Sequence, residues 1–530
     1  MAKLVGLLSA LMAATCVSLS QPALAQAVDQ KLGKVHFETS CSPEAAAAFD
    51  QGMLYQHSFW YRASQREFNK ALKADPGCGI AYWGIALSLL WNPHTAPPLK
   101  NLAEGSAALA KGKEVGAKTE RERDYIAALS AMYADYETVD HRTRVLNYMN
   151  AMEQLASKYP DDDEAQIDYA ISLNVGASPT DKTYANQLKG AAILEKIWDR
   201  QPEHPGIAHY LIHLYDTPAL ADKGLTAARR YAQLAPDAPH ALHMPSHIFT
   251  RVGYWRESID SNTAAAHAAK EGKESADQLH AMDYEVYAYL QLGQDAQAKA
   301  VIDDMMAVPV SGDTFLAAAY ALAASPARYA VERGDWNAAA ALEVRPVPMP
   351  HIAAISWFAK GLGAARSGDA AQAQAAMAQL LPLRDQLRAK KDAYWSEQVD
   401  IQLRIVTAWT QLLMGHQEEA LQAMSDAADA EDKTEKHPVT PGQLAPAREL
   451  YGAMLFQVGN PVQALAAFEA TMHKEPNRLN ATIGAAKAAA AVGDSAKART
   501  YYAAATTQAS DASVDRPEVT NARAFLAGAK

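Results

Sequence analysis

Two stretches of the sequence carry the same arrangement of proline and histidine, thirty-four residues apart. Residues 202–213 read PEHPGIAHYLIH and residues 236–247 read PDAPHALHMPSH, in a chain with 16 histidines. Each stretch contains an H-x-x-x-H pair, and these pairs are His209 with His213 and His243 with His247. Residues four apart share one face of a helix, and neutral imidazoles are ligands for zinc and copper. The repeated spacing therefore predicts a transition-metal site.

The residue that follows the first histidine of each pair excludes one class of enzyme. It is Tyr210 in the first pair and Met244 in the second, whereas zinc proteases with an H-E-x-x-H motif place a catalytic glutamate there. The sequence also lacks a glycine-rich phosphate loop and a G-x-S-x-G nucleophile motif. If the site is catalytic, we expect a hydrolase in which zinc activates water, or an oxidoreductase in which copper changes its oxidation state.

The elements that carry these histidines are predicted to be helices in a repeated array. Alanine-rich segments with apolar residues three and four apart recur along the chain, and strand patterns are almost absent, which predicts an all-α fold. A period of 34 residues is clearest near the C-terminus, where two equivalent sets of small and aromatic residues follow one another. The first set is Gly452, Gly459, Ala464 and Phe468, and the second is Ala486, Gly493, Ala498 and Tyr502.

The N-terminal end shows the same spacing, with Gly52, Tyr55, Phe68, Ala71 and Pro76. Together these residues resemble the tetratricopeptide repeat (TPR), a unit of two antiparallel helices in about 34 residues. Through TSCSPEAAAAFDQGMLYQHSFWY, HALHMPSHIFTRVGYW and EKHPVTPGQLAPARELYG, the chain is also similar to a family of exported bacterial TPR proteins with a repeated H-x-x-x-H segment. The TPR resemblance covers about two thirds of the mature chain and implies a curved solenoid with a concave groove.

The TPR resemblance also assigns positions to the histidines. Pro205 and Pro239 each begin the first helix of a unit, and in TPR proteins positions two, five and nine of that helix line the groove. Positions five and nine hold the four histidines of the two pairs, and position two of the second unit holds His240. The following unit has at the same three positions His280, Asp283 and Tyr287. We expect the four paired histidines to converge on one ion, with His240 and His280 as possible further ligands. His280, Asp283 and Tyr287 are candidates for acid–base or substrate contacts.

Two neighbouring residues are expected to shape this site. Asp216 follows the first pair and could accept a hydrogen bond from a ligand imidazole, as metal-bound histidines usually require. Pro245 lies inside the second pair, where it removes a backbone donor and is expected to kink or widen the helix. Such a proline is either tolerated near the helix start or serves to direct His247.

Three other interpretations stay open. TPR grooves often bind peptides, so the chain could be a metal-free scaffold for a protein or peptide. A metal site without catalysis would make it a metal chaperone or store. The histidines could also be structural groups that form hydrogen bonds beside Tyr210 and Tyr284.

Two segments are predicted to interrupt the repeats. Residues 344–351, VRPVPMPH, contain three prolines in eight residues and are the expected break between an N-terminal array, 26–343, with the histidine-lined groove, and a C-terminal array, 352–530. Residues 426–443 are acidic and polar and are predicted to be a second long connection. This connection contains His437, which we expect to be a solvated loop histidine; the alternative is that the connection covers the groove.

The first 25 residues have the form of a secretory signal peptide. A single charge, Lys3, precedes an apolar run, and Pro22-Ala23-Leu24-Ala25 is a small-residue cleavage pattern. No other apolar stretch suggests a membrane span. We therefore expect a periplasmic or secreted mature protein.

Charge and cysteine content limit the partners and the covalent structure. Without residues 1–25 the formal charge moves from −11 to −12, because Lys3 is lost, and this argues against nucleic acid as a partner. A small molecule or peptide in the groove, with a further protein as a possible partner, is the expected ligand. Cys41 and Cys78 remain, and in an oxidising compartment we expect them to form a disulfide.

Overall fold

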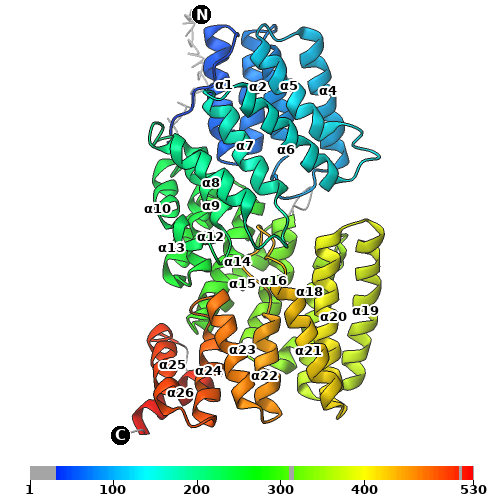
Figure 1. The fold of residues 1–530 in the computed structure, drawn as a ribbon, viewed down its shortest axis with the longest axis vertical. Helices are drawn as coiled ribbons and strands as arrows, with labels where there is room; N and C mark the ends of the chain where they lie inside the picture. Colours follow the sequence, from blue (N-terminus) through cyan, green and yellow to red (C-terminus); the bar gives the residue numbers. More distant parts are fainter. Residues whose placement is uncertain (1–30, 310–315, 513–515, 529–530) are drawn as a thin grey trace, which may run out of the picture.

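The computed structural model describes residues 31–309, 316–512 and 516–528, so the predicted signal peptide lies outside the described residues. Helices, turns and connecting segments make up the whole of these described ranges. Consecutive helices pack as antiparallel pairs along the chain, and Figure 1 shows the N-terminal helices at one end of the molecule and the C-terminal helices at the other. The predicted all-α solenoid of TPR-type helix pairs is confirmed. Among the described residues, no helix combines the length and the apolar character that crossing a membrane requires.

The helices follow in chain order. The first part contains α1 (Pro43–His57), α2 (Tyr61–Ala74), α3 (Gly79–Leu89), α4 (Leu99–Val115), α5 (Glu120–Tyr133), α6 (His141–Lys158), α7 (Asp163–Gly176) and α8 (Ala185–Trp198). The middle part contains α9 (Pro205–Tyr215), the 3-10 helix η1 (Ala221–Gly224), α10 (Leu225–Leu234), α11 (Pro239–His243), α12 (Pro245–Arg251), α13 (Trp255–Glu271), α14 (Ser275–Gln291), α15 (Asp295–Ala307), α16 (Leu316–Glu332) and α17 (Trp336–Ala341). The last part contains α18 (Pro350–Ser367), α19 (Ala370–Ala389), α20 (Ala393–Leu413), α21 (Gln417–Asp432), α22 (Ala447–Gln457), α23 (Pro461–Lys474), α24 (Leu479–Ala491), α25 (Ser495–Gln508) and α26 (Pro517–Gly528).

The small residues of the repeat pattern allow close packing between helices. In each of two units a phenylalanine ring lies between glycines of two flanking helices: Phe68 between Gly52 and Gly84, and Phe468 between Gly452 and Gly484. A Cβ atom at Gly484 would come within 2.5 Å of the Phe468 ring, which is far inside van der Waals contact. The same packing therefore recurs in a repeat near each end of the chain.

The two histidine-bearing segments begin as predicted. Helix α9 starts at Pro205, and α11 starts at Pro239. The second segment is divided at Met244 into α11 and α12, because Pro245 has no N–H to continue the helical hydrogen bonds. The predicted kink at Pro245 is confirmed.

Helices pack together across the proline-rich segment at 344–351. α17 precedes this segment and α18 follows it, and the two helices are in contact. One hydrophobic core runs from Tyr320 on α16, through Phe358 on α18, to Met454 on α22. The division of the chain into two arrays stays a prediction, and the packing on either side of the segment is continuous.

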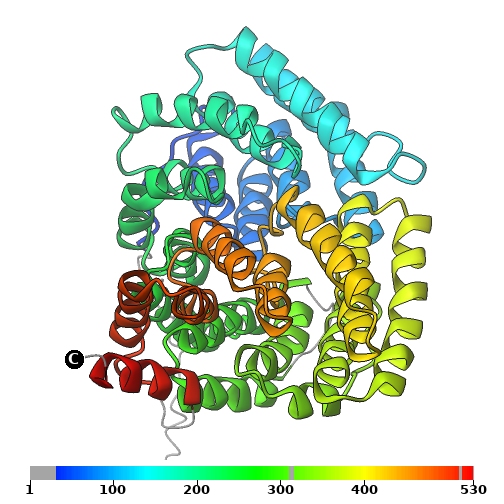
Figure 2. The ribbon, with the colours of Figure 1, turned by 60° about the horizontal axis from the view of Figure 1, so that its bottom comes forward.

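The C-terminal part folds back against the middle of the chain (Figure 2). The Nε1 of Trp255 on α13 donates a hydrogen bond of 2.8 Å to the carbonyl of Asn477, which precedes α24. The Arg516 side chain, just before α26, forms a buried ion pair of 2.8 Å with Asp295 on α15. These contacts enclose the inner face of the solenoid, which in an open TPR array would be an exposed groove.

The connection between α21 and α22 covers part of this inner face. It spans residues 433–446 and is shorter than predicted, because residues 426–432 continue α21; alanine and glutamate in this stretch favour a helix. Lys436 from the connection contacts Asp216 at 2.8 Å, and the carbonyl of Thr440 accepts a hydrogen bond of 3.0 Å from Tyr284. The segment therefore lies against the histidine-bearing helices, and the expectation of a solvated loop is wrong.

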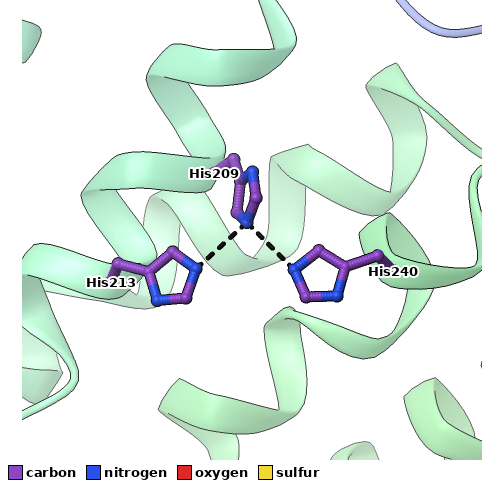
Figure 3. Close-up of side chains that lie close together, drawn as sticks. All are labelled: His209, His213 and His240. Atoms are coloured by element: carbon purple, nitrogen blue, oxygen red, sulfur yellow. Dashed lines mark hydrogen bonds between the residues drawn. The ribbon is translucent and has the colours of Figure 1, made fainter. Parts of the chain in front are cut away.

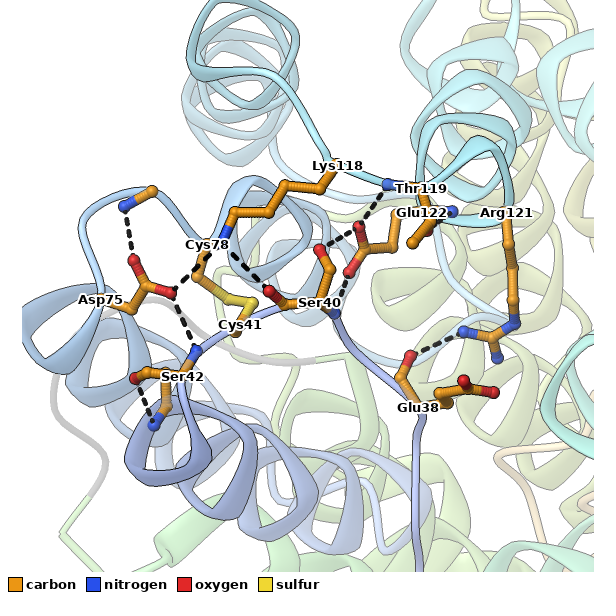
Figure 4. The surroundings of a disulfide bond; sticks show 12 residues. Glu38, Ser40, Cys41, Ser42, Asp75, Cys78, Lys118, Thr119, Arg121 and Glu122 are labelled. Carbon is orange, nitrogen blue, oxygen red and sulfur yellow. Dashed lines mark hydrogen bonds and ion pairs between the residues drawn. A yellow bond between two sulfur atoms is a disulfide. The ribbon is translucent and has the colours of Figure 1, made fainter.

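Cys41 and Cys78 form the predicted disulfide, which joins the start of α1 to the start of α3 (Figure 4). Their Cα atoms lie 5.0 Å apart, within the ordinary range for a disulfide. Hydrogen bonds from Ser40 to Glu122, and from the Ser42 backbone to Asp75, hold the same segment in place. The cross-link therefore fixes the N-terminal end of the solenoid, where a first repeat has a neighbour on one side only.

Candidate metal centre

Three imidazoles from α9 and α11 converge in a first group (Figure 3). The Nε2 atom of His209 lies 3.1 Å from the Nε2 of His213 and 3.1 Å from the Nε2 of His240. When three nitrogens bind a tetrahedral metal ion at about 2.0–2.1 Å, they are about 3.3 Å apart. Two of the three nitrogen–nitrogen distances in the group are therefore close to what a metal ion requires, and the third, between His213 and His240, is within 4.8 Å.

A second group has the same composition and lies on α11, α12 and α14. The Nε2 atoms of His243 and His247 are 3.0 Å apart, and the ring of His280 lies 4.3 Å, centre to centre, from that of His243. One ligand atom from each of the three histidines lies within 4.8 Å of the others. Each group thus consists of an H-x-x-x-H pair and one histidine from a neighbouring helix.

Hydrogen bonds at the opposite ring nitrogen orient three of these histidines. The Nδ1–H of His209 donates to the carbonyl of His57 at 2.6 Å. The Nδ1 of His243 donates to the Oδ1 of Asn262 at 2.6 Å, and the Nδ1 of His247 donates to Asp216 at 2.9 Å. Metal-bound histidines in proteins make this kind of second hydrogen bond, which fixes the tautomer with the lone pair on Nε2. The predicted contact of Asp216 with a site histidine is confirmed.

The second group leaves two lone pairs facing each other. In neutral His243 and His247 the single proton of each ring lies on Nδ1, so neither Nε2 has a proton to share across the 3.0 Å gap. The hydroxyl of Tyr284, 3.3 Å from the Nε2 of His247, donates its proton to the carbonyl of Thr440 instead. A cation between the two nitrogens would satisfy both lone pairs.

Burial keeps these imidazoles neutral. His209, His243 and His247 are at most 2% exposed. Burial lowers the pKa of His209 and of His280 to about 3, and it lowers the pKa of the other four histidines of the two groups as well. Neutral imidazole is the form that binds a metal ion.

A buried charge cluster lies beside the second group. Asp216 contacts His247, and it also pairs with Arg251 and Lys436, each at 2.8 Å. Burial raises the pKa of Asp216, but the charges of Lys436 and Arg251 outweigh this and lower its pKa below the ordinary value. Burial also lowers the pKa of Lys436 to about 8. Glu435 lies 3.9 Å from Arg251 and adds a second carboxylate, so the four groups carry no net charge when Lys436 is protonated.

A third set of buried side chains supports the first histidine group. His57 and His204 each lie against one oxygen of Glu164, at 3.0 and 2.8 Å, and all three side chains are buried. The other nitrogen of His57 is 3.0 Å from the Tyr210 hydroxyl. Because its ring nitrogens already have these partners, His57 acts here as a positioning residue, whose carbonyl orients His209. The glycine at 206 permits this approach, since a Cβ there would lie 2.6 Å from the His57 ring.

Phe59 covers the first group. Its ring centre lies 4.4 Å from that of His209, 5.6 Å from that of His213 and 5.2 Å from that of His240. Phe59 has a φ of 53°, a strained conformation for a bulky residue that persists only where the surroundings enforce it. Phe59 also lines an apolar cavity of about 70 Å³ together with Leu87 and Val175.

The structure separates the six candidate histidines from two other predicted site residues. Asp283 accepts a hydrogen bond of 2.8 Å from Ser325. The Tyr287 hydroxyl contacts Glu475 and accepts a hydrogen bond of 3.0 Å from Arg478. His280, the third catalytic candidate, is in the second histidine group, and Tyr284 rather than Tyr287 approaches the histidines. Tyr284 lies one turn from His280 on the same face of α14, whereas Tyr287 lies about two turns away, roughly 10 Å along the helix axis, and does not reach the histidines.

Several residues of the site were not expected from the sequence. Asn262, Lys436 and Glu164 come from segments that carry no repeated motif and are distant in sequence from the residues they support. His94, which the sequence WNPH predicts at the rim of the groove, joins the cluster, with its ring 4.8 Å from that of His213. The segments of Asn262, Lys436 and Glu164 carry no local signal that specifies which helices meet.

Comparisons with known proteins add little to this description. No protein-family model matches the chain, and no curated protein matches it. Among solved structures it is similar to the human IFIT1 dimer with m7Gppp-AAAA, at 12% identity over 89% of this chain and 97% of that chain, with a TM-score of 0.40. It is also similar to the P58(IPK) TPR domain (12% identity, 92% and 99% covered, TM-score 0.22) and to yeast Tom70 (12% identity, 91% and 95% covered, TM-score 0.26). The chain's own helix pairs and histidine groups define it as an all-α solenoid with an enclosed histidine cluster.

Proposed function

We propose that this chain is an exported metalloprotein in which each of the two histidine groups binds a transition-metal ion. The facing Nε2 atoms of His243 and His247 carry the proposal, because two neutral imidazoles without a proton between them repel at 3.0 Å. The three oriented Nδ1–H donors and the near-tetrahedral spacing around His209 support it.

The enclosed position of the histidines favours a small ligand over a peptide. His209, His243 and His247 are buried, and the connection at 433–446 lies across the inner face. A peptide would have to displace this connection together with the buried Lys436–Asp216 pair. We infer that the ligand at the metal site is a small molecule. The alternatives of a metal chaperone or store, and of a scaffold for a protein partner elsewhere on the surface, remain outcomes of the test.

Metal analysis of the protein purified from the periplasm, before and after reconstitution with zinc or copper, tests the proposal. We expect tightly bound metal in the wild type and its loss in a His209→Ala/His243→Ala variant, which removes one ligand from each group. The matched control is His267→Gln, since His267 is exposed on α13. A reconstituted wild type that holds no more metal than the double variant would overturn the proposal.

If metal is bound, exchange with a chelator separates the roles. A chaperone or store should release its ion readily to a chelating acceptor, whereas a catalytic centre retains the ion and keeps a coordination position for water or substrate. With three protein ligands per group, each ion would have such a position.

A further inference from the structure

The two histidine groups are adjacent to each other. The ring of His213 lies 5.9 Å from that of His247, and the ring of His240 lies 6.0 Å from that of His243. Within the first group the ring centres are 4.9 to 6.5 Å apart. The gap between the groups is therefore no larger than the spacing within one of them, so two bound ions would be close enough to share a bridging ligand.

The charge of the surroundings limits which ions fit. All six ligands are neutral, and the nearest charged cluster, formed by Asp216, Glu435, Arg251 and Lys436, has no negative charge in excess. Two divalent ions would add four positive charges to a buried region whose six ligands carry no charge, which is costly. Two Cu(I) ions would add only two positive charges. Imidazole ligands suit copper, and the buried site suits the ion of lower charge.

A pair of Cu(I) ions has a definite reaction with dioxygen. Each ion gives up one electron and becomes Cu(II), and dioxygen accepts both electrons and becomes a peroxide dianion bound between the two ions. No proton is transferred, and the total charge of the two ions and the oxygen stays at plus two. The buried region therefore acquires no additional charge.

The apolar cavity beside Phe59 is a suitable place for dioxygen to approach. Its volume is about 70 Å³, and its lining includes Leu87, Leu90 and Val175, so it suits a small apolar molecule better than an ion or a peptide. Phe59 lines this cavity and also lies against the three histidines of the first group, so the cavity is next to the proposed copper site.

We propose that the two groups, His209, His213 and His240 together with His243, His247 and His280, hold a coupled pair of copper ions that binds dioxygen. This inference rests on the proposed function and makes it specific, because it names the metal, the number of ions and the ligand that bridges them.

The experiment titrates the full-length mature protein with Cu(I) without oxygen, and then adds dioxygen. We expect two copper ions per chain and uptake of one dioxygen per pair. We also expect a peroxide-to-copper absorption band, without the electron paramagnetic resonance signal of isolated Cu(II), since the two unpaired electrons couple through the bridge. His240→Gln and His280→Gln each weaken one group, and each should leave about one firmly bound copper that gives an ordinary Cu(II) signal after oxidation. His267→Gln should behave as the wild type.

The outcomes distinguish the two proposals. Two coppers that give two independent Cu(II) signals and take up no dioxygen would overturn the coupled pair and leave metal binding intact. A protein that binds two zinc ions and no copper would also overturn the coupled copper pair and leave metal binding intact. A protein that binds no metal would overturn both proposals. Circular dichroism of each variant identifies one that has not folded, and the other variant then gives the test for the pair.

Discussion

His243 and His247 point their Nε2 atoms at each other at 3.0 Å, while the Nδ1 of each donates a hydrogen bond to an oxygen. The acceptors come from different helices: Asn262 on α13 for the first and Asp216, directly after α9, for the second. Each ring is thereby fixed with its lone pair facing the other. A purely structural pair would instead place one proton between the rings, so this relationship is the basis for the metal proposal.

Asp216→Asn should weaken both the fold and the metal site. The change leaves Arg251 and Lys436 buried beside a neutral amide, and breaking such a cluster costs about 3–5 kcal/mol of unfolding free energy. Loss of the carboxylate partner of His247 should reduce metal affinity by about 10- to 100-fold. Urea unfolding and competition with a chelator measure the two effects. Asp511→Asn is the control, because the ion pair of Asp511 with Arg256 is largely exposed and should contribute less than about 1 kcal/mol.

The free energy of unfolding should fall as pH rises from about 4.3 to about 8 because of Glu285 on α14. Burial raises the pKa of this carboxyl group to about 8, so the folded protein holds a proton that the unfolded chain releases near pH 4.3. The contribution is complete at pH values below 4.3 and is lost as pH rises through 8. We expect Glu285→Gln to raise the unfolding free energy at pH 9 by several kcal/mol relative to the wild type, with a much smaller gain at pH 5. An equal effect at both pH values would contradict this prediction.

Removing the Cys41–Cys78 disulfide should destabilise the N-terminal repeats. The cross-link spans 37 residues, and the chain-entropy model gives about 4 kcal/mol for a loop of this length. The Cys41→Ser/Cys78→Ser variant, unfolded in urea, should show this loss, and the wild type under reducing conditions should match it. If reduction leaves the unfolding free energy of the wild type unchanged, the disulfide does not have this role.

Gly484→Ala should destabilise the C-terminal repeats, although alanine favours helices. The new methyl group would lie 2.5 Å from the Phe468 ring, and overpacking of this kind costs about 1–3 kcal/mol. Gly272→Ala is the matched control, because its nearest contact would be an ordinary 3.4 Å. Thermal unfolding of both variants checks the prediction, and a Gly484→Ala protein at least as stable as the wild type would refute it.

The sequence alone determined the helical repeat, the helix starts at Pro205 and Pro239, the kink at Pro245 and the disulfide. Each of these depends on local spacing or on the covalent properties of proline and cysteine, which a sequence states directly. The histidine pairs belong here as well, since residues four apart on one helix share a face whatever the rest of the chain does.

Only the tertiary structure decided how the histidines are grouped. The spacing suggested four ligands around one ion, whereas the fold brings His240 to one pair and His280 to the other. That choice depends on the angle between α9, α11 and α14, which side-chain packing sets and no local pattern encodes. The enclosure of the site is also decided by the tertiary structure. Lys436 contacts Asp216, 220 positions away in the sequence, because the C-terminal repeats fold back onto the middle of the chain.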